Sequence, residues 1–236
     1  MYLTFNGEQS VAGIGSPALF VRLAGCHIRC YLPMLGVLCD TPESLERKSG
    51  EEIEPEALAV RVIDKCRQHG VGDVTLTGGD PLWNKKEDLL KLLSGITHGG
   101  IRVSIETSGT LDWNPYLMYG VHFVLDYKLP SCGRDIYQKN LLFKKPELAK
   151  ELTGNDVIKF VIYDWADFDL AVAALESLEG TKARIVFGVY WNGPIKTANL
   201  VAELLARNLL GKVSLNVQLH KFVYAEVYGE KLPSDI

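Results

Sequence analysis

The chain has 236 residues, a formal net charge of −4 at pH 7, and 47% hydrophobic residues. This length predicts one domain over residues 1–236 with enough apolar residues for a core, and the scattered Lys and Arg residues argue against binding to a nucleic-acid backbone. No apolar run approaches the roughly 18 residues that span a bilayer, and the N-terminus lacks a basic stretch followed by an apolar one. We therefore expect a cytoplasmic protein that acts on a small molecule or a protein partner, with no role at a membrane.

In chain order, β-rich apolar segments alternate with amphipathic ones. Strands are predicted at 18–24, 73–77, 101–106, 121–127, 156–162, 183–189 and 213–217. Helices are predicted at 55–69, 85–95, 165–178 and 195–209, and the less regular residues 128–154 are expected to form a long loop with one short helix. Strand–helix alternation with short links indicates a parallel sheet with right-handed crossovers. Six or seven such strands predict an α/β fold curved into an incomplete barrel.

Three cysteines, Cys26, Cys30 and Cys39, follow the first predicted strand within "GCHIRCYLPMLGVLCDT" (25–41). Parallel sheets collect ligands at this end of their strands, and a tight cysteine group in a chain of this size favours metal or redox chemistry over disulfides. Three thiolates are one short of a closed zinc site or of a capped four-iron cluster, and an open position favours catalysis. His27 as a fourth ligand would favour zinc, although adjacent side chains rarely converge on one metal.

Polar and glycine-rich segments end three further predicted strands. These are "TLTGGDP" (75–81), "IETSGT" (105–110) and "LDYK" (125–128). Gly78 and Gly79 expose backbone groups that a ligand can approach closely. Because the carboxyl ends of parallel strands share one rim, we expect these segments to surround the first cysteine.

The order of these motifs resembles that of radical S-adenosylmethionine (SAM) enzymes, and within them the family of 7-carboxy-7-deazaguanine synthases of the queuosine pathway. The matching segments are "TFNGE" (4–8), "SPALFVRLAGC" (16–26), "CDT" (39–41), "TGGDP" (77–81), "ETSGT" (106–110) and "QLHK" (218–221). The resemblance implies an incomplete (β/α)6-type barrel and a 4Fe–4S cluster on the three cysteines, with SAM on the open iron.

The resemblance also implies a reaction and partners. A 5′-deoxyadenosyl radical would start the ring contraction of 6-carboxy-5,6,7,8-tetrahydropterin to 7-carboxy-7-deazaguanine, with loss of ammonia. Such a lyase would take its electron from a donor such as flavodoxin or ferredoxin, and it would form a homodimer.

Individual roles follow from the positions of residues in the matched motifs. Thr41 matches a magnesium ligand, with Asp40 beside it. The substrate-binding positions are Phe5, Asn6, Gly7, Glu8, Arg22, Thr77 and His220. The SAM-binding positions are Gly78, Gly79, Asp80, Ser108, Asp126, Tyr127 and Lys128. From the residues alone, Arg22 interrupts an apolar strand and needs either a substrate carboxylate or a structural salt bridge, and His220 is equally well explained as a core histidine.

The chain departs from the family pattern at several positions. Three residues separate the first two cysteines, as in the family, but eight separate the next two, where the family has two. The inserted apolar segment 31–38 is expected to pack over the cluster, with a patch for an electron donor or a second subunit as the alternative. Asp126 and Tyr127 replace the family's Ser-Pro. Cys66 is predicted to be a core residue, and Cys132 is assigned no metal.

Two other functions remain open at this point. An activase that abstracts hydrogen from a glycine of a partner protein would share the cluster and SAM, but it would not need Arg22 to bind a small carboxylate. A non-enzymatic zinc or iron–sulfur module that acts as a regulator is the second alternative.

Overall fold

The computed structural model describes residues 1–30, 39 and 41–228, with residues 224–228 described by their backbone. The inserted segment 31–38 and Asp40 lie outside the described residues. Within the described ranges, no helix combines the length and the apolar character that crossing a bilayer requires.

One curved sheet of eight strands, in the order β1 to β8, organises the molecule. Its strands are β1 (Tyr2–Phe5), β2 (Pro17–Leu23), β3 (Asp73–Gly78), β4 (Arg102–Thr107), β5 (His122–Asp126), β6 (Val157–Ile162), β7 (Arg184–Val189) and β8 (Ser214–Leu215). All neighbouring pairs from β2 to β8 are parallel, and β1 pairs with β2 in the antiparallel sense. The predicted parallel α/β fold is confirmed, and the prediction of six or seven strands omitted β1.

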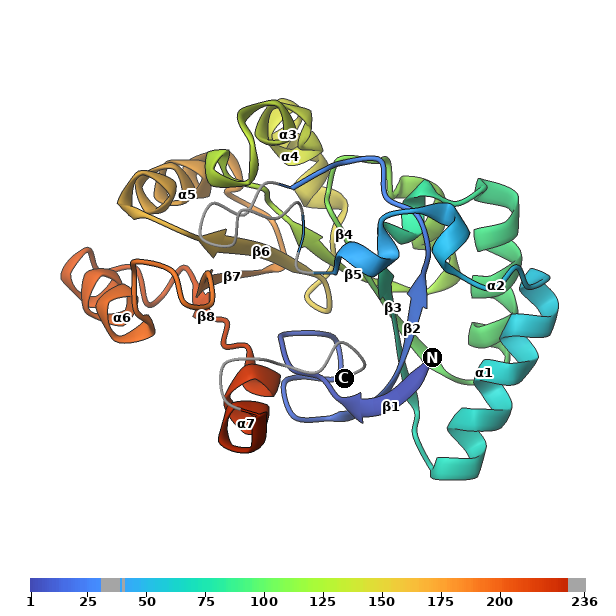
Figure 1. The fold of residues 1–236 in the computed structure, drawn as a ribbon. Coiled ribbons are helices and arrows are strands. Elements are labelled where there is room, and N and C mark those ends of the chain that lie inside the picture. Colours follow the sequence, from blue (N-terminus) through green and yellow to red (C-terminus); the bar gives the residue numbers. More distant parts are fainter. Residues whose placement is uncertain (31–38, 40, 229–236) are drawn as a thin grey trace.

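Helices cover the outer side of the curved sheet (Figure 1). The predicted helices are confirmed as α1 (Pro55–His69), α2 (Lys86–His98), α5 (Trp165–Ser177) and α6 (Thr197–Ala206). Helix α1 begins at a proline and ends at Gly70, whose positive φ of 64° suits a helix C-cap. Its residues Leu58, Val62 and Cys66 are buried against the sheet, so the prediction that Cys66 belongs to the core is confirmed.

Two regions differ from the prediction. Residues 128–154 contain more than one short helix: η5 (Pro130–Cys132), α3 (Arg134–Lys139), α4 (Leu141–Lys144) and η6 (Pro146–Glu151). Asn140 accounts for part of this order, because its side chain accepts from the Leu142 and Phe143 N–H groups and donates to the Asp126 carbonyl at 2.9 Å. No helix was predicted after residue 209, but the structure has helix α7 (Leu219–Tyr228), which begins within the "QLHK" segment.

Four short 3₁₀ helices complete the described elements. They are η1 (Pro42–Ser44), η2 (Arg47–Ser49), η3 (Pro81–Trp83) and η4 (Asn114–Tyr119). The first three lie on the loops that follow β2 and β3, at the rim where the cysteines begin.

The two faces of the sheet differ in chemistry, because successive side chains of a strand point to opposite faces. The outer face is apolar and joins the main core through Leu76, Ile105, Leu125 and Phe160, with their neighbours on the same face. On the inner face, Val124, Val157 and Val186 form a small separate cluster. Two residues further along β5 and β6, the inner side chains are those of Asp126 and Lys159, so apolar layers alone do not fill the interior of the sheet.

The N-terminal segment that follows β1 and helix α7 lie side by side across the open side of the sheet (Figure 1). The Leu219 N–H donates to the Gly7 carbonyl at 2.7 Å. A Cβ on Gly7 would lie 2.0 Å from His220 Nδ1. The two ends of the described chain therefore meet at the predicted substrate-binding segment, and a glycine permits the contact.

The end of β3 lies directly against the loop that leads to Cys26. A Cβ on Gly79 would lie 2.2 Å from the Gly25 carbonyl oxygen, and a Cβ on Gly78 would lie 2.4 Å from that of Leu23. The Gly79 N–H donates to the Leu23 carbonyl at 2.9 Å. Because this N–H is used within the chain, a ligand contact from Gly79 would come through its carbonyl oxygen.

We expect Gly79→Ala to destabilise the protein by about 1–3 kcal/mol, because the added methyl group meets backbone atoms that do not yield easily. Gly72→Ala is the matched control, since a Cβ there meets nothing within 4 Å. Urea unfolding of both variants checks the expectation, and equal midpoints for the two would contradict it.

Candidate active site

The predicted cluster ligands Cys26, Cys30 and Cys39 are half-buried. Burial raises the pKa of Cys26 above its ordinary value, and Asp80, Cys30 and Cys39 add to the rise by repulsion, so the three sulfur atoms lie within electrostatic reach of one another. Among the described residues, no three Cys, His, Asp or Glu side chains meet as they would around a single metal ion.

This spacing fits a larger group than a single ion. The thiolates that hold a four-iron cluster bind different irons and do not converge on one point. The donor set of three predicted thiols fits a cluster with one open iron. Coordination by these three residues stays a prediction.

Cys132, to which the sequence assigned no metal, lies beside the cluster loop. It forms a side-chain hydrogen bond with Cys30, and this bond, with burial second, holds the pKa of Cys132 well above its usual range. The Lys128 ammonium faces both sulfur atoms and donates to Asp126 at 2.6 Å. The predicted SAM-binding residue Lys128 therefore lies at the cluster loop.

Thr41, the predicted magnesium ligand, lies between Cys39 and the end of β3. Its Oγ1 is 3.4 Å from Cys39 Sγ and 3.4 Å from the Gly78 carbonyl oxygen. The hydroxyl is half-buried at the rim of the sheet, which suits a ligand for a hydrated cation.

The Asp80 carboxylate accepts several hydrogen bonds that organise the described site. Its buried carboxylate accepts hydrogen bonds from the Leu82 N–H, the Thr107 hydroxyl and both the N–H and the hydroxyl of Ser108. These bonds occupy both carboxylate oxygens, so Asp80 orients the "ETSGT" turn, and a direct contact of its side chain with SAM stays a prediction.

The hydrogen bonds continue from Ser108 to the cluster loop. Thr110 Oγ1 lies 2.7 Å from Ser108 Oγ and 2.7 Å from His27 Nε2. The His27 ring stacks on Trp83 at 5.1 Å. Thr110 thus engages Nε2 and Trp83 covers the ring face, whereas Nδ1 is buried with no hydrogen-bond partner among the described residues.

A chain of buried charges occupies the inner face of the sheet. Lys159 Nζ lies 2.7 Å from Glu8 Oε2 and 3.1 Å from Asp126 Oδ1. Burial alone would raise the pKa of Glu8, but the attraction of Lys159 outweighs it and leaves the pKa below its ordinary value. For Asp126, burial is likewise outweighed by Lys128 and Lys159, so its pKa is also lowered. Both side chains are therefore carboxylates at neutral pH.

Glu106 lies next to this chain and behaves differently. Burial raises its pKa, Lys159 opposes the rise, and Glu8 adds to it. The Thr77 hydroxyl donates to Glu106 Oε2 at 2.8 Å. The predicted substrate residue Thr77 is thus joined to a carboxyl group that resists ionisation.

The other predicted substrate residues are divided between the interior and the surface. Asn6 is buried and accepts from the Thr75 hydroxyl at 3.1 Å. His220 lies against Gly7 and near Glu8, whose pKa it helps to lower. Phe5 ends β1 and is 62% exposed, so the structure does not bring its ring together with the buried residues.

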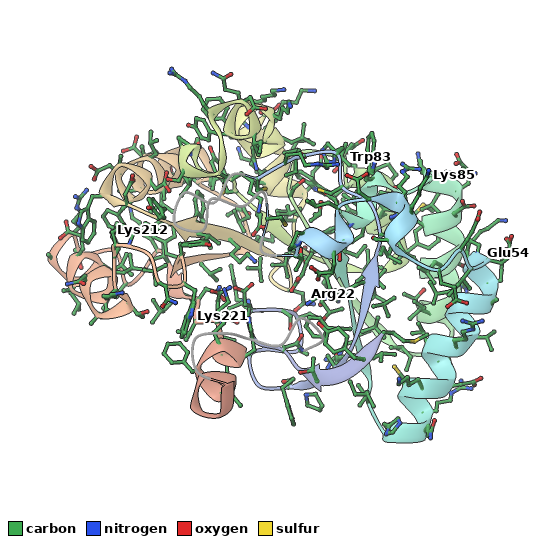
Figure 2. All side chains as sticks on the ribbon, viewed as in Figure 1. Arg22, Glu54, Trp83, Lys85, Lys212 and Lys221 are labelled. Atoms are coloured by element: carbon green, nitrogen blue, oxygen red, sulfur yellow. The ribbon has the colours of Figure 1, made fainter. Side chains whose placement is uncertain are left out.

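Arg22 projects from β2 toward the inside of the curved sheet (Figure 2). Its Nη1 lies 2.7 Å from Glu43 Oε1, with side chains 28% and 50% exposed. An exposed ion pair of this kind contributes little and exchanges readily, so it leaves the predicted role in binding a substrate carboxylate open. The Tyr127 ring is buried and stacks on Phe160 at 4.5 Å, which places that side chain in the core.

Sequence reasoning missed Lys159 and Glu106. The signal for Lys159 is the same as that used for Arg22, a cation within an apolar strand, here "VIKFVI". Glu106 lies in a quoted motif, and its burial on an inner row follows from strand alternation once the faces are known.

We expect Glu106→Gln to stabilise the protein at pH 7. A carboxyl group with a raised pKa stabilises the fold fully below its ordinary value of 4.5, and this contribution is lost as the pH rises through the raised pKa. Glutamine cannot ionise and still offers an oxygen to Thr77. The gain is about 1.4 kcal/mol for each unit by which the pKa is raised.

Urea unfolding at pH 7 and pH 4 measures this effect, with the exposed Glu52→Gln as control. The gain from Glu106→Gln should disappear near pH 4. If Glu106→Gln instead lowered the stability by the same amount at both pH values, the pKa of Glu106 would not be raised and the prediction would be wrong.

Comparisons with known proteins agree with this geometry. Residues 11–115 match a family model described as a 4Fe-4S single cluster domain. The chain is 30% identical to a 7-carboxy-7-deazaguanine synthase of Leptospira interrogans over 97% of this chain and 95% of that protein. It is 30% identical to one of Methanospirillum hungatei over 94% of this chain and 83% of that protein.

Two solved structures of SuiB from Streptococcus suis share the fold. One matches with a TM-score of 0.58 at 14% identity, over 92% of this chain and 53% of that one. The other, bound to S-adenosylmethionine, matches with a TM-score of 0.54 at 15% identity, over 84% of this chain and 45% of that one. The chain thus spans about half the length of these structures.

The relatives match over nearly the whole chain, and the residues that match the 4Fe–4S family model include all three predicted cluster cysteines. The predictions of an enzyme with an iron–sulfur cluster and SAM as cofactors are confirmed. This chain belongs to the 7-carboxy-7-deazaguanine synthase family of radical SAM enzymes.

Proposed function

We propose that the chain converts 6-carboxy-5,6,7,8-tetrahydropterin into 7-carboxy-7-deazaguanine with release of ammonia, as a step toward queuosine. The observation that carries the proposal is the charged inner face of the sheet, where Glu8, Asp126 and Lys159 lie buried. A small, polar heterocycle with N–H groups, a carbonyl and a carboxylate matches such a face. The printed names of the relatives support the same substrate.

The chain's own residues would bind and orient the substrate. The Glu8 carboxylate would accept N–H groups of the pterin ring, with Thr77 and His220 beside it. Arg22 would exchange Glu43 for the substrate carboxylate, which is a better partner when it is bound bidentately away from water. Asn6 would hold the N-terminal segment in place through its bond with Thr75.

The cofactors would lie at the rim of the sheet. The cluster and SAM, when bound, supply the radical chemistry of the reaction. Cys26, Cys30 and Cys39 would hold the cluster. The predicted SAM contacts are Gly78, Gly79, Asp80, Ser108, Asp126, Tyr127 and Lys128, those of Gly79 and Tyr127 through their backbone. Thr41 would bind Mg²⁺, which prefers oxygen ligands and keeps several waters.

A radical SAM enzyme needs an electron donor, and we propose flavodoxin or ferredoxin in this role. We further propose that residues 1–236 act as a single radical SAM domain, that two chains pair as a homodimer, and that the enzyme works in the cytoplasm. The activase alternative shares the cofactors, but it gives no reason for a buried charge chain suited to a small polar substrate.

We expect anaerobically reconstituted protein to be brown, with about four irons per chain and an electron paramagnetic resonance (EPR) signal that changes when SAM is added. With reductant, SAM and the tetrahydropterin it should form the deazaguanine and ammonia. Cys26→Ala should lose the cluster and all activity, whereas Cys66→Ala, at a core position, should keep both. A fully loaded wild-type enzyme that leaves the pterin unchanged would refute the proposed reaction.

A further inference from the structure

We propose that Lys159 is a positioning residue, whose buried ammonium fixes the Glu8 and Asp126 carboxylates on the inner face and thereby sets the affinity for the N–H-bearing edge of the substrate. The inference rests on the proposed function for the identity of that substrate. It assigns a role to Lys159, which would touch neither substrate nor cofactor and would act through Glu8.

The geometry of Lys159 singles it out. It lies at the middle of β6, where its backbone pairs in register with Asp126 of β5, while Val157 and Val186 beside it on the inner face are apolar. Only 8% of the residue is exposed. Its ammonium reaches Glu8, which is 151 positions away in the sequence, at 2.7 Å. A buried lysine that contacts two carboxylates joins the N-terminal segment to the centre of the sheet.

The charges alternate along a line across the inner face. Glu8 is followed by Lys159, then by Asp126, and then by Lys128 at the cluster loop. The substrate end of this line is Glu8, and the cofactor end is Lys128 beside Cys30. Each ammonium therefore fixes the carboxylate next to it, and Lys159 is the member that contacts both carboxylates.

The free-energy cost of burying these ion pairs indicates that they have a role beyond stability. Buried ion pairs seldom stabilise a fold more than apolar side chains of the same size would, because both charges lose their water. Removing one partner is costly, since the other charge is left without compensation. A charge line that adds little to stability for its desolvation cost is suited to holding carboxylates where a ligand can meet them.

The surroundings of Glu8 decide what the loss of Lys159 would do. The groups that face Glu8 are Lys159 on β6, Asp126 on β5, Glu106 on β4, His220 on α7 and the Asn216 amide at 3.4 Å. Without Lys159, burial and the repulsion of Asp126 and Glu106 would outweigh His220. The pKa of Glu8 would then rise above its ordinary value, and the carboxyl group would take up a proton at a higher pH than it now does.

The test compares Lys159→Met, Lys159→Arg and Lys212→Met in the reconstituted holoenzyme. Lys212 is exposed and lies away from the inner face, between α6 and β8, which makes it the control (Figure 2). The quantities measured are KM for the tetrahydropterin, kcat, the pH profile of kcat/KM, and the change in the EPR signal on addition of SAM.

Lys159→Met should raise KM for the pterin by about tenfold or more, the loss expected when a charge-assisted hydrogen bond to the substrate is weakened. The acidic limb of the kcat/KM profile should move to higher pH, and the SAM-induced change in the EPR signal should remain. Lys159→Arg should restore most of the affinity and the wild-type pH profile, because its guanidinium replaces the charge. Lys212→Met should match the wild type.

A readout without substrate separates this inference from the proposed function. In the wild type the lowered pKa of Glu8 stabilises the fold above its ordinary value of 4.5, and this contribution is lost as the pH falls. The difference in unfolding free energy between wild type and Lys159→Met should therefore shrink on acidification.

If the wild type forms no deazaguanine but this difference shrinks as expected, the proposed reaction fails and the coupling of Lys159 to Glu8 stands. If the wild type turns over and Lys159→Met keeps its KM and pH profile, the inference about Lys159 is overturned. A variant that loses only stability or iron content would also overturn it.

Discussion

The structure depends on the alternation of side chains along its parallel strands. Because successive residues point to opposite faces, each strand gives its apolar residues to the outer core and its polar residues to the interior. Phe160 and Lys159 are neighbours in the sequence, yet one is in the main core and the other is in the charge chain. The polar side chains of the site can therefore lie on the inner face while the strands of the sheet stay continuous.

The interior charges constrain one another. Since a buried charge without a partner is costly, each group on the inner face has a counter-charge or a hydrogen-bond donor. Lys159 forms ion pairs with Glu8 and Asp126, and Lys128 forms one with Asp126. Glu106 accepts a hydrogen bond from the Thr77 hydroxyl, and its raised pKa favours the neutral carboxyl group. These contacts join β3, β4, β5 and β6 to the N-terminal segment. Contacts within the chain therefore hold these interior side chains in place.

The sequence predicts those features whose signal is local. The four long helices and seven of the strands follow from periodicity, and the family motifs follow from their order. Strand β1 was missed because it has four residues and pairs at the sheet edge, and α7 was missed because its first turn lies in a matched motif. The contact between Lys159 and Glu8 could not be predicted from the sequence, because nothing near "VIKFVI" indicates that residue 8 lies opposite. Contacts at such separations follow from the curvature of the sheet, which brings the N-terminal segment opposite β6.

The charge chain ends at Lys128, whose ammonium lies beside the cluster loop. Cys30 lies beside Cys132 and faces the Lys128 ammonium, which Asp126 holds at 2.6 Å. A thiolate is favoured beside a cation, so Lys128 suits a loop that must present ionised sulfur atoms. Asp126 in turn is held by Lys159, which also holds Glu8. Three ion pairs, Glu8–Lys159, Lys159–Asp126 and Asp126–Lys128, therefore connect the N-terminal segment with the cluster loop.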